Sequence, residues 1–88
     1  MTKRLLVINE KDNVGVLLED SKAGEFCNYK GKEIKILEDI QFGHKIALKD
    51  FSKEDIVYKY GEEIGYALED IAKGQWIHNH NMGCRRGK

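Results

Sequence analysis

Short alternating stretches, interrupted by glycine, are the feature that most limits what this chain can fold into. No window of about 12 residues keeps apolar side chains at helical spacing without a glycine or a turn cluster intervening. Apolar residues instead recur at every second position, which places them on one face of a strand. Such alternation occurs at Val14, Val16 and Leu18, at Ile34 and Ile36, at Ile56, Tyr58 and Tyr60, and at Ile64, Tyr66 and Leu68. With nine glycines and no prolines, the sequence predicts a mainly β domain of short strands, with at most one or two short helical turns.

One turn design is used several times along the chain. Leu-Glu-Asp followed by a closing glycine occurs at residues 18–24, 37–43 and 68–74, and a looser copy without the glycine occupies 48–54. We expect the leucine to end a buried strand and the aspartate to accept hydrogen bonds from backbone N–H groups two or three residues ahead. The glycine would then supply the positive φ that reverses the chain. Because the spacing between copies is irregular, we expect a single closed domain rather than a solenoid.

Length and charge argue against several classes of protein. The 88 residues suffice for one domain with a modest core. The 15 basic and 15 acidic residues cancel and are interspersed, whereas duplex nucleic acid usually requires a basic face. No apolar run approaches the roughly 20 residues of a membrane span, and the N-terminal apolar stretch is shorter than a secretory signal requires. Two distant cysteines do not make a disulfide framework. We therefore expect a cytoplasmic protein that binds neither nucleic acid nor membrane.

The segment 76–81, Trp-Ile-His-Asn-His-Asn, is the most suggestive for chemistry. If it is a strand, His78 and His80 project from the same face as Trp76, and two imidazoles at this spacing can reach one metal ion. A third ligand would have to come from the remaining histidine, Cys84, a carboxylate or another chain. The alternative is a solvated edge strand whose histidines only form hydrogen bonds.

Two further segments carry cations that could contact an anionic substrate. His44 and Lys45 follow Gly43 in one of the repeated turns, where an imidazole and a point charge could meet a carboxylate. The alternative is an exposed turn histidine without a role. Lys59 lies between two tyrosines and would point away from them in a strand, either toward a ligand or simply into solvent.

Residues 83–88 form a basic end of the chain. Its arginines either belong to a flexible tail or pair with a partner or a carboxylate through bidentate hydrogen bonds. We place one domain at residues 1–82 and a tail at 83–88. No dinucleotide-binding glycine motif, P-loop, CxxC, HExxH or nucleophile-elbow motif is present. The residues alone thus indicate a single β domain with a histidine-containing terminal segment.

Taken in order, these segments resemble the N-terminal SAF-type domain of the altronate/galactarate dehydratase family. The resemblance covers about residues 7–81, and its matching stretches are 8–16, 43–48, 58–67 and 70–81. These stretches combine a Gly-His-Lys turn, a Lys-Tyr-Gly-x-x-Ile-Gly turn and a His-x-His-Asn segment. That combination is specific, although each motif alone is weak.

The resemblance implies a SAF-like β-clip fold and an activity. Family members dehydrate aldonic or aldaric acids to 2-keto-3-deoxy products, commonly with a divalent metal such as iron or manganese. Some members carry this domain as a small subunit beside a large catalytic subunit, and sulfolactate sulfo-lyase looks like a two-subunit relative that eliminates sulfite. A fused member would continue far beyond Lys88, so this chain is either such a subunit or a piece of a longer protein. We identify no family counterpart for residues 82–86.

From the resemblance and the residue types together, we expect a sugar-acid hydro-lyase whose active site is shared between this chain and a large subunit. The large subunit would hold most of the metal site. The expected catalytic residues are His44, Lys45, Lys59, His78 and His80; the expected substrate contacts are Lys45, Lys59, Asn81 and Arg85; and the expected metal ligands are His78 and His80. The alternatives are a sulfolactate sulfo-lyase small subunit, a non-catalytic module that binds an anionic sugar or assists assembly, and a small metal-binding protein. Edge strands in so small a domain also favour homo-oligomers.

Overall fold

Ten short strands and no helix make up the part of the chain that the structure describes, residues 2–84 of a computed structural model. The strands are β1 (Thr2–Lys3), β2 (Leu5–Leu6), β3 (Val14–Leu17), β4 (Phe26–Tyr29), β5 (Lys32–Lys35), β6 (Lys45–Ala47), β7 (Ile56–Lys59), β8 (Glu62–Ala67), β9 (Trp76–Ile77) and β10 (Met82–Gly83). This confirms the prediction of a mainly β fold. Within the described residues, the short helical turns allowed by the sequence are not formed, and no helix is long and apolar enough to cross a membrane.

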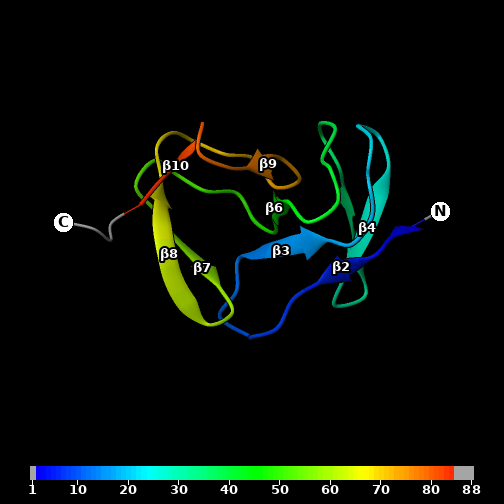
Figure 1. Cartoon of the computed structure of the whole chain (residues 1–88), viewed down its shortest axis with the longest axis horizontal. Helices are drawn as coiled ribbons and strands as arrows, with labels where there is room; N and C mark the ends of the chain where they lie inside the picture. The colour runs from blue at the N-terminus through cyan, green and yellow to red at the C-terminus, as the bar shows by residue number, and fades with distance from the viewer. Residues whose placement is uncertain (1, 85–88) are drawn as a thin grey trace.

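The strands form three small sheets spread along a molecule of 42 × 23 × 20 Å. The central sheet has the order β2-β3-β6-β9 and is antiparallel throughout. Figure 1 shows the β7–β8 hairpin at one end of the molecule, the β4–β5 hairpin at the other, and β3 with β6 between them. The end sheets are completed by β10, antiparallel to β8, and by β1, parallel to β4.

Two apolar clusters share the central strands. β3 places Val14 in one cluster and Leu17 in the other, because side chains an odd number of residues apart point to opposite faces of a strand. The cluster beneath the β7–β8 hairpin consists of Val14, Ala47, Phe51, Val57, Ala67, Ile71 and Ile77. The cluster beneath the β4–β5 hairpin consists of Leu17, Cys27, Ile34, Ile36, Ile40, Ile46 and Leu48. Complete burial of each large aliphatic side chain contributes about 1.5–3 kcal/mol, so the fold depends on both clusters.

In the β7–β8 hairpin, the face predicted from the alternation of large apolar residues is not the face that is buried. The buried positions there are Val57, Gly65 and Ala67, whereas Tyr58 and Tyr66 are only partly buried. The core side is small because β10 packs closely on it: a Cβ added at Gly65 would lie 2.2 Å from a backbone oxygen of β10. Because the backbones of β8 and β10 approach so closely, Gly65 has no room for a side chain, although the periodicity had favoured large residues on the core side.

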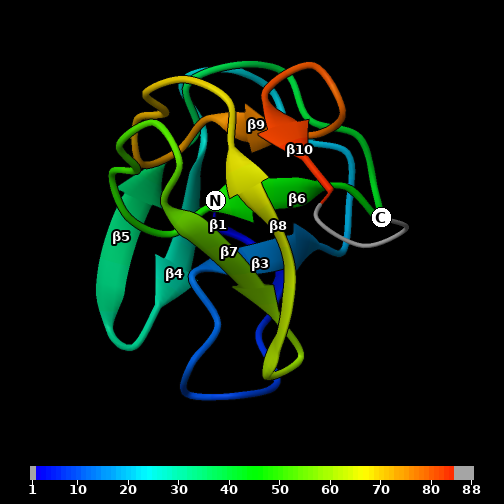
Figure 2. The same cartoon turned by 90° about the vertical axis from the view of Figure 1, so that its left-hand side faces the viewer.

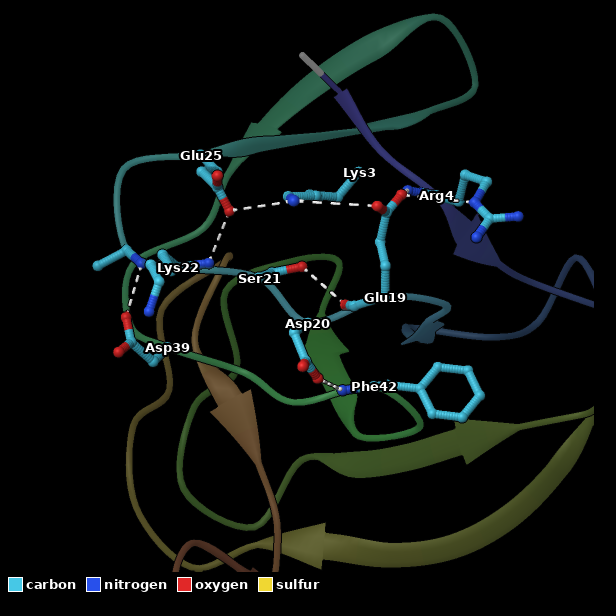
Figure 3. Close-up of polar contacts among 10 residues, drawn as sticks. Lys3, Arg4, Glu19, Asp20, Ser21, Lys22, Glu25, Asp39 and Phe42 are labelled. Atoms are coloured by element: carbon cyan, nitrogen blue, oxygen red, sulfur yellow. Dashed lines mark hydrogen bonds and ion pairs between the residues drawn. The ribbon is translucent and has the colours of Figure 1, made fainter.

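The repeated turns are braced in pairs. Asp20 Oδ1, in the first turn, accepts a hydrogen bond from the Phe42 N–H of the second turn at 2.9 Å. In the opposite direction, Asp39 Oδ1 of the second turn accepts from the Ala23 N–H of the first at 2.9 Å. Figure 3 shows Asp20 reaching Phe42 across the gap between the two turns. The prediction that each aspartate serves its own turn is therefore wrong. An antiparallel bridge between Ser21 and Ile40 brings the other turn within reach.

The second pair of turns repeats this arrangement. Asp50 Oδ1 accepts from the Lys73 N–H at 2.8 Å and Asp70 Oδ1 from the Lys53 N–H at 3.0 Å, around a Phe51–Ile71 bridge. Asp50 follows Asp20 by 30 residues, and Asp70 follows its counterpart in the first half by 31. The irregular period of the motif thus comes from an internal duplication in which each half is turn, hairpin, turn. The extra residue of the second half is accommodated by a register shift beside Val57, within the β7–β8 hairpin.

Two details of the repeated turn differ from expectation. Leu37 and Leu68 are 45% and 39% exposed rather than buried, because each follows a buried residue and so faces away from the core. The closing glycines do have positive φ, and in the looser copy Glu54 adopts φ 77° in their place. The turn geometry is therefore kept even where glycine is lost.

Candidate functional site

Pairing of two central strands builds the site. In the β6–β9 ladder, Lys45 lies opposite Ile77 and Ile46 opposite Trp76. The turn that ends at His44 is thereby placed beside the segment that follows β9. Figure 2 shows β9 next to β6, and the loop that leads from β9 to β10. Residues more than thirty positions apart in the sequence, such as His44 and Trp76, meet at this edge of the central sheet.

Trp76 is the centre of the site. Its indole Nε1–H donates a hydrogen bond to His44 Nδ1 at 3.1 Å, with the two ring centroids 5.5 Å apart. Its ring also stacks on His78, at 5.4 Å and an interplanar angle of 13°, and contacts His80 at 4.9 Å. His44 and His78 are themselves 5.3 Å apart. All three histidines of the sequence therefore gather around one indole.

The strand expected for residues 76–81 ends at Ile77, so this part of the prediction is wrong. His78 and His80 lie in a turn, in which the His78 carbonyl accepts from Asn81 N at 3.1 Å. The Asn81 side chain holds this turn: its Oδ1 accepts from His78 N at 3.0 Å and its Nδ2 donates to the Trp76 carbonyl at 2.9 Å. Asn81 is 1% exposed, so the structure gives its amide a role in the fold, whereas the sequence suggested a substrate contact.

Two lysines add positive charge to the imidazoles. Burial lowers the pKa of Lys45, and the nearby Lys59 ammonium lowers it further. Burial also lowers the pKa of His78, and Lys45, His44 and His80 act in the same direction. Among the residues that the structure describes, neither lysine forms a salt bridge. A surface with this charge suits an anionic ligand, and a His78 kept neutral can accept a proton or bind a metal ion.

A metal centre is not complete within residues 2–84. No group of three or more histidine, cysteine, aspartate or glutamate side chains is placed there to hold an ion. His78 and His80 both lie against Trp76, and the Nδ1 of the third histidine, His44, is already occupied by the indole N–H. The third ligand that the sequence required is therefore not supplied by the described residues, and metal binding by His78 and His80 stays a prediction.

The remaining residues singled out by sequence lie elsewhere. Arg85 falls outside the described residues. Cys84 is exposed, whereas Cys27 is fully buried and its pKa is raised by burial to about 11. β10 includes Gly83, one residue past the predicted domain boundary.

Sequence reasoning missed the importance of Trp76 and of the polar pair Asp12 and Asn13. Asn13 bonds β7 at both ends of its amide, to the Ile56 carbonyl at 2.9 Å and the Tyr58 N–H at 2.8 Å. Asp12 is 6% exposed and accepts from the Gly61 N–H at 2.8 Å. These two side chains fasten the β7–β8 hairpin to the central sheet, and only their place beside β3 in the sequence hinted at it.

Comparison with known proteins identifies the family. The family model described as the altronate/galactarate dehydratase SAF domain matches residues 3–85. The chain belongs to this SAF domain family. An altronate dehydratase of Bacillus subtilis is 42% identical to this chain, and the aligned region covers 90% of this chain but 16% of that protein. The chain thus spans only 16% of the length of that relative.

Shorter relatives match over much more of their length. The (2R)-sulfolactate sulfo-lyase subunit alpha of Chromohalobacter salexigens is 28% identical over 98% of this SAF domain chain and 99% of that subunit. The subunit of the same name from Paracoccus pantotrophus is 44% identical over 54% of this chain and 72% of that subunit. The SAF domain therefore corresponds to one part of a long relative and to nearly all of a short one.

Proposed function

We propose that this SAF domain is the small subunit, or the N-terminal domain, of a lyase that dehydrates a sugar acid. In this proposal it contributes cations and imidazoles to an active site that a large subunit completes. The observation that carries the proposal is the gathering of three histidines around Trp76, with Lys45 close enough to lower the His78 pKa and Lys59 close enough to lower the Lys45 pKa. Among the described residues, neither lysine forms a salt bridge. Membership of the altronate/galactarate dehydratase SAF family supports the choice of reaction.

The chemistry of dehydration requires such a set of groups. A base removes the proton from the carbon next to the carboxylate, and the hydroxyl on the following carbon leaves with a proton as water. The enediolate formed in between concentrates negative charge, which fixed cations stabilise. Burial and the Lys59 ammonium both lower the Lys45 pKa. Lys45 and Lys59 would bind the carboxylate, since an anion between them relieves their mutual repulsion.

The imidazoles would handle the proton. Because the His78 pKa is lowered by burial and by the neighbouring cations, its ring is neutral at neutral pH and free to accept a proton. His80 is exposed and would face the large subunit. We assign the divalent metal, iron or manganese, mainly to the large subunit. That assignment follows from the lack of a three-ligand group within residues 2–84. His78 and His80 are the imidazoles that this chain could add to it, in which case His78 would bind the metal in place of acting as the base.

A second candidate is the small subunit of a sulfolactate sulfo-lyase. The observation in its favour is that the similarity extends over 99% of the subunit alpha from Chromohalobacter salexigens. Elimination of sulfite uses the same proton abstraction beside a carboxylate, so the same lysines and imidazoles would serve.

The test is co-purification of the tagged chain from its native host, followed by mass spectrometry and assays with altronate, galactarate and sulfolactate. We expect a large dehydratase-like partner, and the substrate that is turned over separates hydro-lyase from sulfo-lyase. In the complex, His78→Ala and His80→Ala should lower turnover strongly, whereas Lys32→Ala, on the exposed outer hairpin, should not. Wild-type turnover in both histidine variants would contradict the shared active site. Recovery of the chain alone and inactive would favour a non-catalytic binding module.

A further inference from the structure

His44 occupies a position at which the other three copies of the turn carry a capping acceptor. Five residues after each turn aspartate stand Glu25, Asp55 and Gln75 in those copies. Each accepts a hydrogen bond from the backbone N–H three residues earlier, at 2.7, 2.8 and 2.6 Å. In the fourth copy this position is His44, and within residues 2–84 no side chain accepts a hydrogen bond from the equivalent Gln41 N–H. This turn therefore lacks the side-chain cap of the other copies, and the His44 imidazole instead accepts a hydrogen bond from Trp76.

The bond from Trp76 determines which nitrogen of His44 carries hydrogen. An indole N–H can only donate, so His44 Nδ1 must accept at the 3.1 Å contact. A neutral imidazole has one N–H, which therefore lies on Nε2. His44 consequently offers a hydrogen-bond donor away from the indole rather than a free basic nitrogen.

The residue that imposes this arrangement is held through its backbone and by stacking of its ring. The Trp76 backbone N–H donates to Glu38 Oε2 at 2.9 Å, and the Trp76 backbone carbonyl accepts from Asn81 Nδ2 at 2.9 Å. One face of the ring is stacked on His78 at 13°. His44 and Trp76 also line one surface hollow of about 310 Å³ together with Asp39 and Gln41. The His44–Trp76 pair is thus held by the surrounding residues on one side and faces the hollow on the other.

We propose that Trp76 is a positioning residue that holds His44 with Nδ1 as acceptor and Nε2–H as donor, so that His44 binds an oxyanion of the ligand and is not the base. The hydrogen-bonding arrangement stands by itself, whereas the role toward the ligand rests on the proposed function. It divides the imidazoles: His44 donates, and His78 is left to accept the proton.

The arrangement can be measured on the full-length, ¹⁵N-labelled chain without any activity. The sequence has one tryptophan, so its indole N–H signal is unambiguous. We expect that proton to exchange slowly with solvent and to show a coupling across the hydrogen bond to His44 Nδ1, with the His44 ring proton on Nε2. His44→Gln is the matched variant, because glutamine restores the cap found at Gln75 and so keeps the fold while removing the imidazole. It should melt no lower than wild type and speed indole exchange.

Activity in the reconstituted complex completes the test. Trp76→Phe keeps an aromatic ring on His78 but has no indole N–H. We expect a loss of roughly tenfold in kcat/KM, the lower end of the loss seen when the hydrogen-bond partner of a metal-bound histidine is removed. The proposal is overturned by a rapidly exchanging indole N–H without coupling, by a ring proton on Nδ1, or by unchanged kcat/KM in folded Trp76→Phe. An inactive wild-type complex would instead count against the proposed function, and the spectra would still decide the His44–Trp76 bond.

Discussion

Replacement of Asp12 by asparagine tests how the loop before β3 is fastened to the second hairpin. Asp12 Oδ1 accepts from the Gly61 N–H at 2.8 Å, and Oδ2 accepts from the Asn9 and Ile8 N–H groups at 3.1 and 3.3 Å. Asparagine has the same shape but only one acceptor oxygen. Its amide NH₂ would therefore face backbone N–H donors at one of these two places.

The expected loss follows from these contacts. A hydrogen bond to a charged group contributes about 1.5–3 kcal/mol, and the variant keeps one oxygen while losing the charge and the other acceptor. We expect Asp12→Asn to lower the free energy of unfolding by about 2 kcal/mol, which for a domain of this size is a fall in Tm of roughly 8–16 °C. Urea unfolding and thermal melts followed by circular dichroism measure both. The control is Glu10→Gln, which removes the same charge from an exposed neighbour and should change stability by less than about 0.5 kcal/mol.

The pH dependence gives the sharper criterion. Burial by itself raises the Asp12 pKa, but the bonds from the N–H groups of Gly61, Asn9, Tyr60 and Ile8 outweigh burial and lower it. A carboxyl whose pKa is lower in the folded state stabilises the fold above its unfolded value of about 3.9, and this contribution is lost as the pH falls through the folded value. The gap between wild type and Asp12→Asn should be full at pH 7 and shrink below about pH 4. An equal gap at pH 3 and pH 7, or none at pH 7, would refute the reasoning.

Three further predictions concern the hairpins and the thiols. Gly65→Ala should cost about 1–3 kcal/mol in urea unfolding, because the new Cβ would lie 2.2 Å from the Gly83 oxygen; a loss below about 0.5 kcal/mol would show that β10 moves freely. Glu54→Gly should raise stability by up to about 1 kcal/mol, because it relieves a positive φ of 77°, whereas Glu33→Gly in exposed β5 should lower it; equal effects in thermal melts would contradict this. A thiol reagent should label exposed Cys84 at once and Cys27, whose pKa burial raises to about 11, only on unfolding, as mass spectrometry of timed samples can check.

Local pattern was sufficient for the fold class but not for the faces of every strand. Two-residue alternation and glycine turns predicted a mainly β chain, and the structure confirms it. The pattern failed in the β7–β8 hairpin, where close packing of β10 requires Gly65 on the core side. It also failed at the turn aspartates, since a bond such as that from Asp20 to Phe42 exists only once two distant turns have met.

The candidate site was foreseen in its residue types more than in its geometry. Spacing alone placed His78 and His80 beside Trp76 on a strand, whereas a turn closed by the Asn81 side chain brings them there. The histidine at position 44 could have been found from the repeat itself, because the other copies carry glutamate, aspartate or glutamine at that place. Neither composition nor periodicity shows the bond from the indole, which depends on the pairing of β6 with β9.

The internal duplication raises a question of self-recognition. Because both halves use the same hydrogen bonds from backbone N–H groups to aspartate side chains, those bonds do not prevent the halves of two chains from exchanging partners in a domain swap. Side-chain volume does distinguish them. The first half combines small Ser21 with large Ile36, and the second combines large Phe51 with small Ala67 at the equivalent, buried places. An exchange that brought the first turn of one half against the hairpin of the other would combine Phe51 with Ile36 and Ser21 with Ala67, and such mismatched volumes are destabilising in a close-packed interior.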